Sequence, residues 1–141
     1  MIKQLAHICF HTRRTKEMVS FYTEKLGLKL KFTLDNEDRQ PFGYYIACGT
    51  QTFIEIFDHA MAQKKWSDGK VQELVGGNQY KHFCLQVDNI EQLKADLEKK
   101  GVKVTDVKVG MDNSKQAWIG DPDGNAIELM EYTAKSLQVQ K

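Results

Sequence analysis

Two histidines and two glutamates recur in this chain at almost the same separation. His7 and His82 are 75 residues apart, and Glu55 and Glu128 are 73 residues apart. Two imidazole nitrogens and two carboxylate oxygens make a donor set that suits a divalent first-row metal ion. With one coordination position left for water or substrate, such a set fits a catalytic metal better than a structural one.

Taken singly, each of these residues has an ordinary interpretation. A lone histidine in a strand is more often a core or edge residue, and a lone strand glutamate more often faces solvent. The four differ because each occupies the equivalent place in a repeated pattern. HICF and HFCL begin at the histidines, and the glutamates are the central residues of FIEIF and AIELM. Burying four polar groups without a shared partner would be costly, so we favour metal binding by all four.

One repeated unit must position these residues. Each copy is predicted to run strand, helix and three strands (βαβββ), which gives an α+β fold built from two paired modules. Each helix has an apolar period of 3.6 residues and ends at a glycine, Gly27 or Gly101, as left-handed helix caps do. Residues 64–75 are predicted to form a further short helix. The predicted divisions are a first module, a linker, a second module and a polar, loosely held tail: residues 1–58, 59–79, 80–132 and 133–141.

Strand alternation assigns the side chains of each module to two faces. We expect the apolar face to pack against the helix of its own module, and the mixed face to line a concave surface. The side chains expected on the mixed faces are those of His7, Cys9, His11, Phe53, Glu55 and Phe57 in the first module, and those of His82, Cys84, Gln86, Ala126, Glu128 and Met130 in the second. One histidine and one glutamate of each module therefore share a face.

Composition excludes several classes of function. A net charge of +1, from 20 basic and 19 acidic residues, provides no field that would attract nucleic acid. The sequence contains no apolar run long enough to span a membrane, and its first residues do not resemble a signal peptide. Three cysteines, an odd number in a chain of 141 residues, are most simply reduced thiols. We therefore expect a cytoplasmic protein that acts on a small molecule.

Five segments carry a resemblance to a known family: LAHICF, FYTEKLGLKL, FIEIF, KHFCLQV and DPDGNAIELME. Through them the chain resembles the vicinal oxygen chelate superfamily, which includes glyoxalase I, extradiol dioxygenases, methylmalonyl-CoA epimerase, and fosfomycin- and bleomycin-resistance proteins. The resemblance covers roughly residues 3 to 132 and implies paired βαβββ modules around a metal ion. The order His7, Glu55, His82, Glu128 is similar to the ligand order of bacterial-type glyoxalase I (lactoylglutathione lyase).

That resemblance implies a chemistry and a cofactor. Bacterial-type glyoxalase I uses Ni²⁺, Zn²⁺, Co²⁺ or Mn²⁺ to isomerise the hemithioacetal of a 2-oxoaldehyde and glutathione. The metal would act as a Lewis acid that stabilises an enediolate. Glu128, and after it Glu55, is the expected base that moves the proton between adjacent carbons. A homodimer is also implied. The expected substrate pocket contains six further residues: His11, Phe53, Phe57, His59, Trp118 and Met130.

Two positions depart from the bacterial glyoxalase pattern. An arginine that contacts the glutathione carboxylate is replaced here by His11, and an asparagine four residues after the second ligand is replaced by His59. These departures leave the use of glutathione open. The alternatives are another metal-dependent member of the superfamily, such as a ring-cleaving dioxygenase or an epimerase, or a non-catalytic protein that binds a small molecule and confers resistance.

Overall fold

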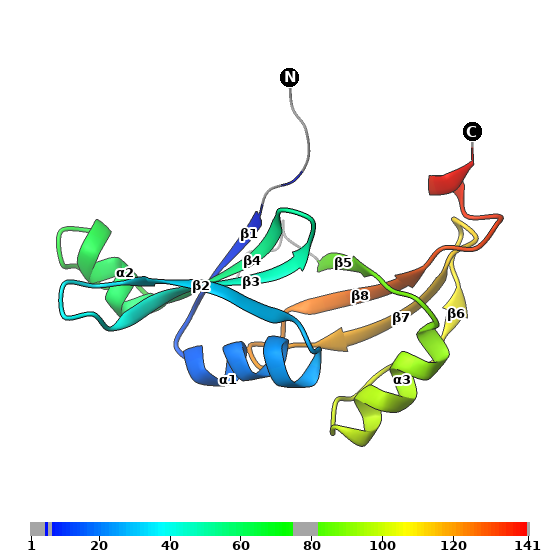
Figure 1. The fold of residues 1–141 in the computed structure, drawn as a ribbon, viewed down its shortest axis with the longest axis horizontal. Coiled ribbons are helices and arrows are strands. Elements are labelled where there is room, and N and C mark those ends of the chain that lie inside the picture. The colour runs from blue at the N-terminus through cyan, green and yellow to red at the C-terminus, as the bar shows by residue number, and fades with distance from the viewer. Residues whose placement is uncertain (1–4, 6, 75–81, 141) are drawn as a thin grey trace. The chain divides into compact units, whose positions relative to one another are not determined.

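The computed structural model describes residues 5, 7–74 and 82–140, and the chain divides into two compact units, residues 1–76 and 77–141. Each unit contains one four-stranded mixed sheet. The elements of the first unit (Figure 1) are β1 (His7–Thr12), α1 (Thr15–Ser20), a π-helical turn (Phe21–Lys25), β2 (Lys29–Asp35), β3 (Pro41–Gly49), β4 (Thr52–Asp58) and α2 (His59–Trp66). Those of the second are β5 (His82–Gln86), α3 (Ile90–Lys99), β6 (Lys108–Val109), β7 (Lys115–Gly120), β8 (Ala126–Glu131) and a 3₁₀ turn (Leu137–Val139).

The two sheets have the same topology. Their strand orders are β1-β4-β3-β2 and β5-β8-β7-β6, so the first strand of each unit lies beside the last. These neighbours are parallel, and the other strand pairs are antiparallel. The predicted α+β fold with two βαβββ modules is therefore confirmed. Because these strands are neighbours, side chains of the first strand of each unit can contact side chains of its last strand directly.

The helix of the first unit changes its winding midway. After α1, the amide of Leu26 donates to the carbonyl of Phe21, five residues earlier, over 3.1 Å. This wider turn keeps Met18 and Tyr22 on the buried side, both with no exposed surface. Gly27 then ends the helix with φ +72°, the left-handed conformation that the sequence predicts.

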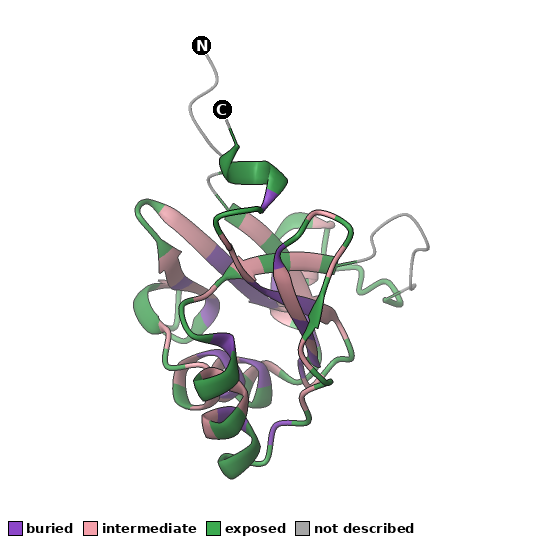
Figure 2. Ribbon diagram, turned by 90° about the vertical axis from the view of Figure 1, so that its right-hand side faces the viewer, coloured by how far each residue is buried: buried purple, intermediate pink, exposed green. Residues whose placement is uncertain are grey.

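The helix of the second unit is regular. Asn89 caps its first turn by accepting a hydrogen bond from the amide of Gln92 over 3.3 Å. Ile90 and Leu97 are buried on one side, and Gly101 comes next with φ +79°, again as predicted. Buried residues of both units, purple in Figure 2, occur on strands and helices, whereas most loop residues are exposed and green.

Helix α2 occupies an unexpected place. The short helix predicted at 64–75 is wrong, because α2 begins at His59, directly after β4, and residues 67–74 are not helical. The start is fixed by Asp58, whose carboxylate accepts a hydrogen bond from the amide of Met61 over 3.0 Å. The end of the predicted linker, residues 75–79, lies outside the described residues.

The C-terminal segment is held to the second unit rather than loose. Ser136 has no exposed surface, and its hydroxyl accepts hydrogen bonds from the Ser114 hydroxyl over 2.9 Å and from the Thr133 amide over 2.8 Å. The expectation of a loose tail is therefore wrong, because a polar sequence can be fixed by hydrogen bonds as well as by apolar packing. Within the described residues, no helix is long and apolar enough to cross a membrane.

Candidate functional site

The first half of the candidate site is centred on Glu55, in the middle of β4. Its register neighbours are Cys9 on β1 and Tyr45 on β3, and only 6% of its surface is exposed. The Nε2 atom of His7 lies 3.5 Å from its Oε2 atom. The side chain of His7 is much more exposed than that of Glu55, 45% against 7%. The pair therefore joins a buried carboxylate to an imidazole at the surface of this unit.

The second half repeats this arrangement around Glu128, in the middle of β8. Its register neighbours are Cys84 on β5 and Trp118 on β7, and its exposed fraction is also 6%. The Nε2 atom of His82 lies 3.3 Å from its Oε2 atom. The ring of Trp118 meets the His82 ring edge-on, with centroids 4.8 Å apart. The duplicated sequence thus produces two His–Glu pairs of nearly identical geometry.

A cysteine accompanies each glutamate. Cys9 is exposed, but partial burial of its thiol raises its pKa to about 12, with a further contribution from the hydrogen bond that the thiol donates to Glu55. Burial likewise raises the pKa of Cys84 to about 12, helped by the charge of Glu128 and by a hydrogen bond to it. Both cysteines are unpaired in the described chain and are protonated at neutral pH. They act as weak donors that help to hold the carboxylates in place.

Each His–Glu pair suits half of a metal site. Two ligands bound to one ion at about 2.1 Å each are separated by roughly 3.0–3.4 Å, and the two pairs show 3.5 and 3.3 Å. A neutral imidazole nitrogen and a carboxylate oxygen also match the preferences of Zn²⁺, Ni²⁺, Co²⁺ and Mn²⁺. No group of three or more His, Cys, Asp or Glu side chains suited to a metal occurs among the described residues. Convergence of the two pairs on one ion therefore stays a prediction.

The two pocket histidines of the first unit contact each other. The Nδ1 atoms of His11 and His59 are 3.3 Å apart, and the Nε2 atom of His59 is 2.5 Å from the carbonyl oxygen of Gln72. His59 is 3% exposed. The ring of His11, which is partly buried, packs against Phe57 with centroids 5.6 Å apart. Burial and the neighbouring His59 lower the pKa of His11, although the charge of Glu55 acts in the opposite direction.

The other predicted pocket residues remain within their own units. Phe57 is buried at 6% exposure, whereas Phe53 is partly buried and faces the ring of Tyr45 at 5.9 Å. In the second unit, Met130 is buried and its sulfur is 3.9 Å from the amide nitrogen of Gln138. Strand pairing aligns Phe53 with His7 and Phe57 with His11. These side chains are therefore register neighbours of site histidines, as alternation requires.

From the sequence, Tyr45 is expected only in the apolar wall around the site, whereas the structure places it beside Glu55 as a further functional candidate. A hydrogen bond from its hydroxyl to Glu55 is the main reason that its pKa is raised to about 12, with burial second. Its ring stacks on Phe32 at a centroid distance of 4.3 Å and meets the His7 ring edge-on at 6.0 Å. Tyr45 and Trp118 are 73 residues apart, the separation of the two glutamates. Applying the 73-residue offset to the strand before each glutamate strand would have identified Tyr45 and Trp118 as equivalent residues.

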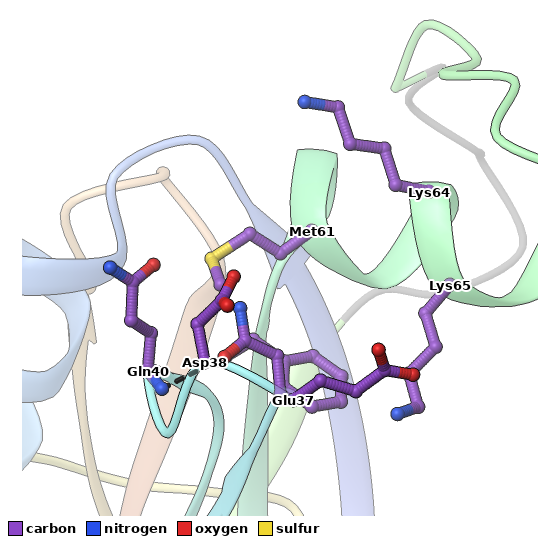
Figure 3. Close-up of a pocket in the computed structure, with 8 residues that line it drawn as sticks. Glu37, Asp38, Gln40, Met61, Lys64 and Lys65 are labelled. Atoms are coloured by element: carbon purple, nitrogen blue, oxygen red, sulfur yellow. Dashed lines mark hydrogen bonds between the residues drawn. The ribbon is translucent and has the colours of Figure 1, made fainter.

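A separate pocket of about 420 Å³ lies between the β2–β3 turn and α2 of the first unit (Figure 3). Acidic side chains of the turn, Glu37 and Asp38, and basic side chains of the helix, Lys64 and Lys65, line it together with Met61. None of the predicted site residues is part of it. This mixed-charge hollow is therefore distinct from the His–Glu pairs.

Comparisons with known proteins agree with this architecture. Residues 4–129 match the model of the Glyoxalase/Bleomycin resistance protein/Dioxygenase superfamily. The lactoylglutathione lyase of Salmonella typhimurium is 30% identical over 132 residues, which cover 91% of this chain and 92% of that protein.

Solved structures share the fold at lower identity. The lactoylglutathione lyase of Agrobacterium tumefaciens has a TM-score of 0.70 at 19% identity, over 92% of this chain and 94% of that one. TnmS3, an antibiotic binding protein from Streptomyces, has a TM-score of 0.72 at 20% identity, over 94% and 98%. One fold thus carries both a lyase and a binding protein. The family match over most of the sequence shows that this chain belongs to the glyoxalase/bleomycin resistance protein/dioxygenase superfamily.

Proposed function

We propose that this protein is a divalent-metal-dependent lyase or isomerase of the glyoxalase type. It moves a proton between adjacent carbons of a small oxo substrate, such as the hemithioacetal of a 2-oxoaldehyde and a thiol. The observation that carries the proposal is the duplicated His–Glu pair, with separations of 3.5 and 3.3 Å at equivalent register positions. Similarity to lactoylglutathione lyases over nine-tenths of the chain supports the same class of reaction.

Four side chains would hold the metal ion: His7, Glu55, His82 and Glu128. Superfamily members generally bind divalent metals, and Ni²⁺, Zn²⁺, Co²⁺ and Mn²⁺ suit this donor set. When bound, the ion supplies Lewis-acid polarisation of the substrate's oxygens, which acidifies the adjacent C–H bond. The protein's contribution is to present imidazoles at the surface of each unit and carboxylates held in place by their strands.

Glu128 is the proposed base, with Glu55 in a secondary role. Both carboxylates receive a hydrogen bond from a cysteine thiol, but Glu55 also receives one from the Tyr45 hydroxyl. Trp118, the equivalent of Tyr45, has no hydroxyl to offer. Glu128 is therefore the less restrained carboxylate and the better suited to take a proton from one carbon and return it to the next.

The substrate arm beyond the reacting carbons would lie along the mixed faces of the sheets. We assign this role to His11, Phe53, Phe57 and His59 in the first unit and to Trp118 and Met130 in the second. Aromatic and thioether side chains limit the access of water to the site. Assembly as a homodimer and a cytoplasmic location stay predictions.

Metal removal and restoration test the proposal. Protein stripped with a chelator should lose isomerase activity towards the hemithioacetal of methylglyoxal, a small 2-oxoaldehyde, and one of the four ions should restore it. Elemental analysis should show about one ion per site. Stoichiometric metal without isomerisation of any hemithioacetal would refute the reaction, and failure to bind any of the ions would refute the metal site. Oxygen consumption with a catechol would indicate a ring-cleaving dioxygenase instead.

A further inference from the structure

Two histidines of the first unit, His11 and His59, form a hydrogen-bonded series that ends on the backbone. The Gln72 carbonyl oxygen is 2.5 Å from His59 Nε2, and His59 Nδ1 is 3.3 Å from His11 Nδ1. His11 lies on the same face of β1 as His7, four residues along the strand. At about 3.3 Å per residue, their Cα atoms are roughly 13 Å apart. The hydrogen-bonded series runs from the Gln72 carbonyl through His59 to His11. It thus ends at the His11 imidazole, which a substrate extending along β1 would meet.

The carbonyl at one end determines where every proton lies. A carbonyl oxygen only accepts, so Nε2 of His59 must carry a proton and donate it. In a neutral ring the other nitrogen is then bare, so His59 Nδ1 accepts a hydrogen bond from the Nδ1–H of His11. His11 in turn is left with a bare Nε2. In this arrangement the last nitrogen of the series, His11 Nε2, is a hydrogen-bond acceptor.

Among the described residues, no carboxylate lies within ion-pair distance of either ring. His59 is 3% exposed, and a charge buried there would need a carboxylate partner. The nearest carboxylate in sequence, Asp58, is occupied, because it accepts from the Thr15 hydroxyl and the Met61 amide. Burial and His59 lower the pKa of His11, and Glu55 only partly opposes them. Neighbouring charges are paired elsewhere, since Arg13 forms an ion pair with Glu73 at 2.7 Å.

We propose that the His11–His59 pair is a specificity site whose acceptor atom, His11 Nε2, selects a substrate arm ending in a neutral hydrogen-bond donor, such as a hydroxyl or an amide N–H, and disfavours one ending in a carboxylate. A carboxylate would face a bare nitrogen lone pair with no proton between the two, which leaves its charge without a partner. The inference rests on the proposed function and names its substrate class: thiol conjugates whose distal end is a hydroxyl or an amide.

Three thiols of matched length test this preference. N-(4-hydroxybutanoyl)cysteamine, N-pentanoylcysteamine and N-succinylcysteamine end in a hydroxyl, a methyl and a carboxylate. Their methylglyoxal hemithioacetals should be isomerised in that order of kcat/KM. We expect about tenfold between the hydroxyl and methyl arms, because one hydrogen bond of about 1.4 kcal/mol corresponds to a factor of ten. Equal values for these two arms, or a preference for the carboxylate arm, would overturn the inference.

Two variants make the test specific to this site. His11→Arg replaces the acceptor with a bidentate donor and should reverse the order in favour of the carboxylate arm. Ala60→Arg adds the same charge at an exposed position of α2, one residue from His59, and should preserve the native order. A reversal in both variants would show that net charge, rather than the His11–His59 pair, selects the arm.

A spectroscopic readout separates this inference from the proposed reaction. Long-range ¹H–¹⁵N NMR spectra should show protonated Nδ1 and bare Nε2 in His11, and the opposite tautomer in His59. If no hemithioacetal is isomerised, the proposed function fails. Titration of the His11 signals with the three free thiols then still ranks hydroxyl, methyl and carboxylate ends by affinity. A protonated Nε2 in His11 would refute the inference whatever the outcome of the assay.

Discussion

The two His–Glu pairs are nearly identical, but the strands beside them differ. Each pair combines an exposed histidine with a glutamate at 6% exposure and a neighbouring cysteine. Beside Glu55 lies Tyr45, which donates a hydrogen bond to it. Beside Glu128 lies Trp118, which instead packs its ring against His82 at 4.8 Å. The two units thus share the His–Glu pair proposed to bind metal and differ in the residues that support it.

This difference suggests a division of labour between two otherwise equivalent carboxylates. A carboxylate held by a hydroxyl and a thiol is well suited to remain a ligand, because its oxygens are already oriented. A carboxylate with fewer fixed donors can move between the metal and a substrate carbon at less cost. We therefore propose that the first unit is the more rigid support and the second the more reactive one.

The largest expected effect separates the two glutamates. Glu128→Gln should lower kcat by about a thousandfold, within the range of 10²–10⁴ typical of a lost general base, with metal content nearly preserved. Glu55→Gln should chiefly weaken metal binding, so that added metal partly restores activity. Steady-state kinetics over a metal titration distinguishes the two, with the exposed Glu24→Gln as the control. Equal losses of kcat at saturating metal would remove the proposed distinction.

The two halves share a cysteine with a raised pKa beside each glutamate. The pKa values of Cys9 and Cys84 are both raised to about 12 from about 9. Since the thiolate is the reactive form, alkylation of the metal-free protein by iodoacetamide at pH 8 should be more than a hundredfold slower than in denaturant. Peptide mass spectrometry over time measures each site. Rapid modification of one cysteine alone would show that the two carboxylates do not protect their thiols alike.

The same shifts determine how stability depends on pH. A thiol whose pKa rises on folding binds more protons in the native state than in the unfolded state between about pH 9 and 12. The free energy of unfolding of the metal-free protein should therefore fall as the pH rises through that window. Chemical denaturation at several pH values measures the slope. Cys9→Ala together with Cys84→Ala should reduce it.

The strands and their faces could be predicted from local sequence patterns, whereas contacts between residues far apart in the sequence could not. Alternation placed Glu55 and Glu128 on their faces because side-chain direction in a strand depends only on position along it. The bond between Tyr45 and Glu55 requires the register of β3 against β4, which the sequence predicts only through the repeat. The link from His59 to Gln72 depends on the path of the segment after α2, for which the sequence offers no periodic signal.

A smaller effect tests the support of Glu55 directly. Tyr45→Phe removes the hydroxyl and keeps the ring, including its stacking on Phe32 at 4.3 Å. We expect metal affinity to fall by about tenfold, at the low end of the losses typical when a group that orients a metal ligand is removed. The matched change in the second unit, Trp118→Phe, removes no donor to Glu128 and should alter the affinity less. Competition with a metal-sensitive dye measures both variants, and a larger loss in Trp118→Phe would contradict the assignment.

The smallest effect concerns the segment after the last strand of each sheet. After β4 comes α2, fixed by Asp58, whereas β8 is succeeded by a segment fixed by Ser136. Ser136→Ala would leave the buried Ser114 hydroxyl and the Thr133 amide without this acceptor, at a cost of about 1–3 kcal/mol. The urea midpoint should fall accordingly, whereas the neighbouring exposed Lys135→Ala should change little. Hydrogen exchange should localise the loss to the second unit, because the partners of Ser136 among the described residues all belong to that unit. Equal loosening of β4 would instead mean that the two units unfold as one.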